Sequence, residues 1–195
     1  MFTPIYRILS LSCLLIVATQ VKDLRASDFG VTGLISIPSA RMSQDGYLKA
    51  NFSRTKIVNT LNLTYQASPW LETTFRYSIF NPYEEPGSQD FNRDRSYAVK
   101  VRMLNETEYL PQLAIGVRDI LGTGVWSGEY LVGSKKFKDL DLTAGIGWGR
   151  FSDRGSYSNP LAIFSDAFDV RPNSESSRGG KIRGNSFFRG PVGYF

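Results

Sequence analysis

Residues 140–149 read LDLTAGIGWG, and the alternation of side chains in this stretch decides the fold class. A strand turns successive side chains to opposite faces, whereas a helix brings residues three and four apart onto one face. On a strand, one face would carry Leu140, Leu142, Ala144, Ile146 and Trp148. The other face would carry Asp141, Thr143 and three glycines. The period of two therefore predicts a β-strand with one apolar face.

The same period of two recurs along the chain. It predicts further strands at residues 61–66, 71–79, 96–103 and 113–118, and weaker ones at 47–54 and 127–136. Aromatic residues make up 13% of the chain, and such side chains favour strands. We therefore expect an all-β fold, an antiparallel meander of about seven or eight amphipathic strands.

The first 26 residues predict an export signal. Arg7 precedes an uncharged apolar run at residues 8–18, which is too short to span a bilayer comfortably. We expect cleavage after Ala26, so that residues 27–195 form the β-barrel domain. Cys13 lies inside the apolar run rather than at its end, which argues against lipidation. The alternative, a buried helix of a cytosolic domain, lacks helical packing partners downstream.

Strand length and connection length favour an outer-membrane barrel. Tilted membrane strands need about 9 to 11 residues, and their short periplasmic turns alternate with long outer loops. Tight links at 67–69 and 137–139, with a medium one at 105–111, alternate here with long ones at 80–95 and 151–185. A soluble barrel or sandwich would instead turn the apolar face inward. Alternation alone leaves both open.

The composition excludes several classes of function. The chain contains no His, which removes His-based acid–base catalysis and the commonest metal ligand. Its single Cys cannot form an internal disulfide. The formal charge is +5, and no cluster of Lys and Arg suggests a nucleic-acid surface. We expect no catalytic, cofactor-binding or metal-binding residue, and no nucleic-acid partner.

If the apolar face meets lipid, the opposite face acquires a mostly basic lining around Glu72. Such a lining favours anionic solutes, including glycans that carry uronic acid or phosphate. The alternative role is pairing within the lumen, for example between Glu72 and an arginine. The predicted basic lining consists of Arg76, Lys100, Arg102, Arg118 and Lys135.

Four segments resemble the YjbH-type family of exopolysaccharide-associated outer-membrane proteins. The most specific is FGVTGLISIPSARMSQDGYL at residues 29–48, and residues 63–77, 115–124 and 187–195 are similar to the same family. The resemblance implies an outer-membrane β-barrel that works beside polysaccharide-synthesis and export proteins, with no enzymatic activity or cofactor. It also implies that the chain corresponds to an amino-terminal part of a longer architecture.

Two functional hypotheses follow. The first is a non-enzymatic outer-membrane barrel in exopolysaccharide export or surface assembly, whose partners are outer-membrane lipid, anionic polysaccharide and export proteins. The second is a soluble periplasmic barrel or sandwich that binds a lipid or glycan. An outer-membrane lipase or acyltransferase is disfavoured because the chain has no His.

Overall fold

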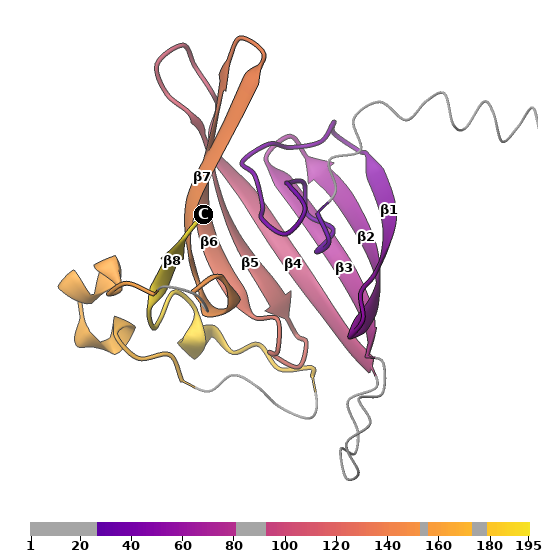
Figure 1. The fold of residues 1–195 in the computed structure, drawn as a ribbon, viewed down its shortest axis with the longest axis vertical. Helices are drawn as coiled ribbons and strands as arrows, with labels where there is room; N and C mark the ends of the chain where they lie inside the picture. Colours follow the sequence, from indigo (N-terminus) through magenta and orange to yellow (C-terminus); the bar gives the residue numbers. More distant parts are fainter. Residues whose placement is uncertain (1–26, 81–92, 153–155, 173–178) are drawn as a thin grey trace, which may run out of the picture.

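The computed structural model describes residues 27–80, 93–152, 156–172 and 179–195 (Figure 1). Within these ranges one antiparallel sheet of eight strands forms, and each strand pairs with the next along the chain. The all-β meander expected from the sequence is confirmed. The strands are β1 (Leu48–Arg54), β2 (Val58–Ser68), β3 (Leu71–Phe80), β4 (Arg93–Leu104), β5 (Gln112–Ile120), β6 (Gly128–Phe137), β7 (Leu140–Trp148) and β8 (Val192–Tyr194).

In the part of the chain that the structure describes, helical structure is limited to four short 3-10 helices between β7 and β8. They are η1 (Gly149–Phe151), η2 (Pro160–Ile163), η3 (Asp166–Phe168) and η4 (Gly184–Ser186). In the described ranges, no helix combines the length and the apolar composition needed to cross a membrane.

Hairpin turns set the register of the meander. Phe137 pairs with Leu140, which leaves Lys138 and Asp139 as a two-residue turn. Lys138 adopts a φ of 53°, the left-handed conformation that tight hairpin turns use. The predicted tight links at 67–69 and 137–139 therefore fall at hairpins. The signal peptide, its cleavage after Ala26 and most of the expected loop at 80–95 lie outside the described residues.

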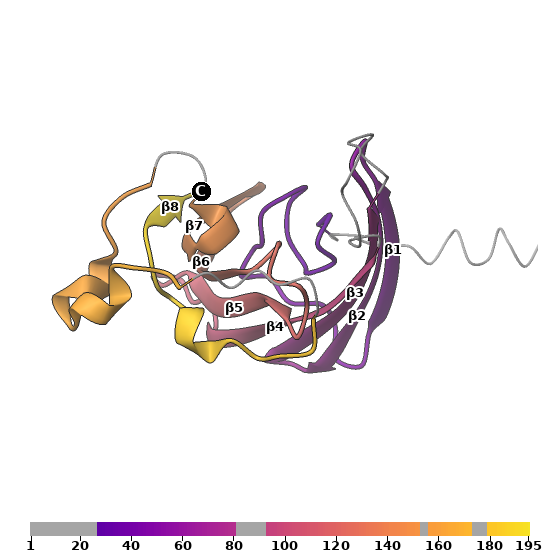
Figure 2. The ribbon, with the colours of Figure 1, turned by 90° about the horizontal axis from the view of Figure 1, so that it is seen from below.

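The sheet is curved and open. Figure 2 shows the curvature, with the segment before β1 lying in the hollow of the sheet. Among the described residues, no pairing joins β1 to β8, so the sheet is open and does not close into a barrel. A partial barrel is what the sequence led us to expect.

The two faces of the sheet differ in chemistry and exposure. Along β2, Thr64 on the inner, concave face is fully buried, whereas its neighbour Leu63 on the outer, convex face is 39% exposed. The alternation continues through β3 and β4, where the buried positions are mostly polar. The outer face exposes large apolar side chains, including Leu48, Phe52, Leu61, Leu63, Tyr65, Ile79, Tyr97, Leu140 and Leu142.

A small apolar core lies under β5 and β6. It consists of Ala40, Ala114, Tyr130 and Val132, against which Phe151 and Phe195 pack. Glycines make room for these rings: a Cβ at Gly116 would lie 2.3 Å from the Tyr130 ring, and one at Gly145 would lie 2.5 Å from the Phe195 ring. Gly145 and Gly147 thus serve close packing against aromatic side chains, those of Phe195 and Phe151.

Candidate functional site

The concave face is occupied by residues 27–46, which we name the inner segment. It folds back on itself through a bridge between Gly33 and Pro38 and through the bond from Ser27 N–H to the carbonyl of Val31. Gly30 has a φ of 85°, and a Cβ there would lie 2.7 Å from Cβ of Asn62. The left-handed backbone and the close approach both require glycine at this position.

Hydrogen bonds fix the inner segment to strands on both sides of the hollow. On β2, the Thr64 hydroxyl donates to the carbonyl of Gly30 at 2.9 Å. On β5, the Gln112 amide donates to the carbonyl of Ala40 at 2.8 Å, and the Ala40 N–H donates to Ser134 Oγ on β6 at 2.9 Å. The polar inner face therefore serves as the binding surface for the backbone of this segment.

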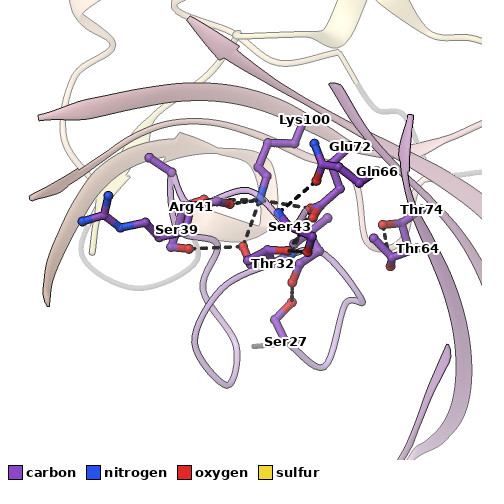
Figure 3. Close-up of polar contacts among 12 residues, drawn as sticks. Ser27, Thr32, Ser39, Arg41, Ser43, Thr64, Gln66, Glu72, Thr74 and Lys100 are labelled. Atoms are coloured by element: carbon purple, nitrogen blue, oxygen red, sulfur yellow. Dashed lines mark hydrogen bonds and ion pairs between the residues drawn. The ribbon is translucent and has the colours of Figure 1, made fainter. Parts of the chain in front are cut away.

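Glu72 and Lys100 form the centre of the site (Figure 3). Lys100 Nζ lies 3.0 Å from Glu72 Oε1, and it donates to the carbonyls of Thr32 at 3.1 Å and Arg41 at 2.8 Å. These three contacts account for all three protons of the ammonium group. Lys100 thereby joins β3, β4 and the inner segment at one point.

Glu72 receives several donors at this centre. The Thr32 N–H donates to Oε1 at 2.9 Å, the Thr32 hydroxyl donates to Oε2, and Lys49 Nζ lies 3.4 Å from Oε2. Both Glu72 and Lys100 are completely buried, so each charge depends on its partners for solvation. Glu72 is thus paired on the inner face with two lysines, and not with an arginine.

Arg41 holds the end of the inner segment against the β4–β5 and β6–β7 hairpins. Its guanidinium donates to Asp141 at 2.7 Å, to Glu106 and to Gln112 at 3.1 Å. The hydrogen bond that Arg41 donates to Asp141 raises the pKa of Arg41, against the opposite effect of desolvation by burial. The pKa of Glu106 is lowered, chiefly by the backbone N–H of Lys136 and then by Arg41.

Two arginines enclose an aromatic ring at the other end of the inner face. The Cζ atoms of Arg76 and Arg118 lie 4.3 Å and 3.9 Å from the ring centroid of Phe29. Arg118 also lies 3.8 Å from the ring centroid of Phe151. Stacking on aromatic faces is favourable for guanidinium groups, since their planar charge is weakly hydrated.

The basic residues predicted from the sequence to line a lumen differ in where they lie. Arg76, Lys100 and Arg118 are buried on the inner face. Arg102 alternates with Lys100 but lies half-buried near the end of β4. These four side chains do not line an open lumen, because the inner segment occupies the hollow of the sheet (Figure 2).

The prediction for Lys135 was wrong. It alternates with buried Ser134 and is paired in register with outward-facing Leu142, so its side chain leaves the sheet on the convex face. Its ammonium group contacts the carbonyls of Thr107 and Glu108 in the β4–β5 link. The basic stretch at the end of β6 therefore supports a neighbouring hairpin and does not extend the inner lining.

The inner segment itself is what the sequence analysis missed. Its residues were recognised by their resemblance to a family, and nothing in their pattern showed that they fold onto the sheet. A usable signal was present in β2, where Thr60, Asn62 and Thr64 make up the buried face. Short polar side chains at successive inward positions can pair with the backbone of a covering segment, as Asn62 and Thr64 do with the carbonyls of Asp28 and Gly30.

The segment after β7 is also held to the sheet. Arg171 donates to both carboxylate oxygens of the buried Glu129 at 2.7 Å and 2.9 Å, and the Phe188 N–H donates to Glu129 at 2.9 Å. Residues 173–178 lie outside the described part of the chain. Among the residues that are described, no group of three or more His, Cys, Asp or Glu is placed to hold a metal ion.

Comparison with known proteins places this arrangement in a family. A family model described as "Exopolysaccharide biosynthesis protein YbjH" matches residues 25–195. The chain is 38% identical over 174 residues to the "Uncharacterized lipoprotein YjbH" of Escherichia coli (strain K12). That match covers 87% of this chain but 25% of the relative, so the chain spans about a quarter of its length. No solved structure matches. The chain therefore belongs to the YjbH exopolysaccharide biosynthesis family.

Proposed function

We propose that the chain is an outer-membrane β-sheet protein whose convex face contacts lipid, and that it serves exopolysaccharide export or surface assembly without catalysing a reaction. The partners in this proposal are outer-membrane lipid, an anionic polysaccharide and polysaccharide-export proteins. The family description supports the link to exopolysaccharide.

The observation that carries the membrane part of the proposal is the orientation of the two faces. A soluble β-sandwich or barrel buries its apolar face and hydrates its polar face. Here Thr60, Asn62 and Thr64 are buried, while Leu61, Leu63 and Tyr65 of the same strand are each about 40% exposed. Membrane barrels show this inverted order, because lipid solvates the apolar side chains and the interior is polar.

A second candidate is a lipid-anchored envelope protein. The E. coli relative is named a lipoprotein, and Cys13 is the single cysteine of this chain. In that case acylation of Cys13 would hold the protein at the membrane surface, and the exposed apolar face would need a protein partner. Labelling cells with radioactive palmitate separates the candidates, because the first one predicts no label in the chain and no change in a Cys13→Ala variant.

The non-enzymatic role is tested through the polysaccharide itself. Cells that lack the protein should retain sugar-nucleotide precursors while the amount of polysaccharide at the surface and in the medium falls, and the wild-type chain should restore it. An unchanged amount of polysaccharide with altered linkages or substituents would instead indicate an enzyme. An unchanged amount and composition would contradict the proposal.

A further inference from the structure

A small cavity lies at the end of the inner face where Arg76 and Arg118 enclose Phe29. Its volume is about 10 Å³, and its walls include both arginines, Asp119 and Trp126. A cavity of this size holds the centre of one water molecule. The two arginines are only 7% and 5% exposed, so their charged ends are well separated from bulk solvent.

Four of the residues around this cavity carry buried polar atoms without a hydrogen-bond partner among the described residues. The donors are Nη1 of Arg76, Nε and Nη1 of Arg118, and Nε1 of Trp126; the acceptor is Oδ1 of Asp119. Most buried polar groups in native proteins are paired, since an unpaired one costs about 1–3 kcal/mol and a charged one more. Because all four residues line one cavity, their unpaired atoms point to a polar ligand there.

The chemistry of these atoms defines the ligand. Guanidinium N–H groups from two arginines match the oxygens of a carboxylate, and they do so in directed, charge-assisted bonds. The free oxygen of Asp119 needs a donor, which a sugar hydroxyl supplies. The ring of Trp126 lies 5.0 Å from Cζ of Arg76, and it offers an apolar face to a sugar ring.

We propose that Arg76, Arg118, Asp119 and Trp126 form a subsite for one carboxylate-bearing sugar unit of a glycan, and that Phe29 fills this subsite in the present structure. A sugar ring is far larger than the cavity, so it enters only when a wall moves. Phe29 is the wall that can move, because its half-buried side chain can rotate away while the hydrogen bonds of Asp28 and Gly30 to β2 hold its backbone in place. The inference rests on the proposed contact with polysaccharide and adds its residues and ligand class.

The test is a titration of the purified full chain in detergent micelles with tetragalacturonate, and with maltotetraose as the uncharged probe. Arg118→Gln and Arg76→Gln remove charged donors and should weaken tetragalacturonate binding by roughly 10-fold or more. Trp126→Phe keeps the ring, removes one donor and should weaken binding less. Phe29→Ala vacates the subsite and should strengthen binding. Lys135→Gln, on the outer face, is the matched control and should leave the affinity unchanged.

Opposite effects of the Phe29 and arginine variants cannot result from a general loss of folding, which would weaken binding in all of them. Unchanged tetragalacturonate affinity in both arginine variants would overturn the inference, because solvent alone would then satisfy these groups. Equal binding of maltotetraose would overturn the carboxylate assignment. Either result would leave the outer-membrane proposal standing, since that proposal fails only if the chain is absent from the outer membrane or does not affect polysaccharide.

Discussion

Lys100 Nζ lies 3.0 Å from Glu72 Oε1, and neither side chain has any surface exposed to solvent. Breaking such a pair leaves one charge buried without its partner, which is strongly destabilising. Lys100→Met should lower the free energy of unfolding by about 3 kcal/mol, measured by urea titration in detergent. The carbonyls of Thr32 and Arg41 would lose their donor at the same time.

The control for Lys100→Met is Lys135→Met, which removes a lysine with a partly exposed ion pair to Glu106. That change should cost no more than about 1 kcal/mol. Equal effects of the two substitutions would contradict the central role of the Glu72–Lys100 pair.

Gly30 should tolerate no side chain. Gly30 and Gly46 both have positive φ, at 85° and 73°, so alanine costs about 1–2 kcal/mol of backbone strain at either position. Only at Gly30 would the added Cβ meet Asn62 and Thr74, at 2.7 Å and 2.8 Å. Gly30→Ala should therefore lower unfolding stability by a further 1–3 kcal/mol or so relative to Gly46→Ala. Matching values for the two variants would mean that the inner segment does not pack against β2 and β3.

Leu63 should be sensitive to charge in a membrane and insensitive in water. An arginine on the lipid face of a barrel costs about 2–4 kcal/mol near the bilayer midplane, whereas surface substitutions in soluble proteins change stability by about 0.5 kcal/mol or less. Leu63→Arg should thus destabilise the chain in lipid vesicles. Tyr109→Arg changes a residue of the β4–β5 link that is 85% exposed, and it should have little effect. A small effect of Leu63→Arg would favour the soluble alternative.

The contacts of the Glu106 carboxylate in the β4–β5 link should stabilise the protein in a pH-dependent way. The pKa of Glu106 is lowered in the folded state by the Lys136 N–H and by Arg41. Because the pKa of Glu106 is lower in the folded than in the unfolded state, its ionised carboxylate stabilises the fold fully above pH 4.5, the ordinary pKa of Glu. This stabilisation is lost as the pH falls through the pKa that Glu106 has in the folded state. Unfolding stability measured below pH 4.5 should therefore decline less steeply in Glu106→Gln than in the wild type. Parallel curves would exclude this contribution.

The strand meander was predictable because period-two alternation is a local property. The stretch 140–149 showed which side chains share a face, and the inward-facing glycines at 145 and 147 lie against Phe195 and Phe151 as strand alternation requires. Which face of the sheet is buried was not predictable, since the alternation is the same whether the apolar side meets lipid or a core. In the structure the polar face is the buried one, because Thr64 is buried and Leu63 is exposed.

The inner segment could not be predicted for a different reason. Its contacts join residues far apart in sequence, such as Ala40 with Ser134 and Arg41 with Asp141. No local pattern encodes such pairs, and the sequence could accordingly offer an arginine only as an example of a partner for Glu72. Lys135 was misplaced because adjacent lysines on β6 make the alternation ambiguous, and the register with Leu142 decides it.

The most direct test of the account is the fate of a Cys13→Ala variant of the tagged full chain after cell fractionation and a urea wash of the membranes. A sheet that contacts lipid through its convex face should remain in the outer-membrane fraction and resist the wash as the wild type does. Recovery of the variant as a soluble periplasmic protein would contradict the lipid-facing assignment and would show that an acyl anchor, rather than the sheet, holds the chain at the membrane.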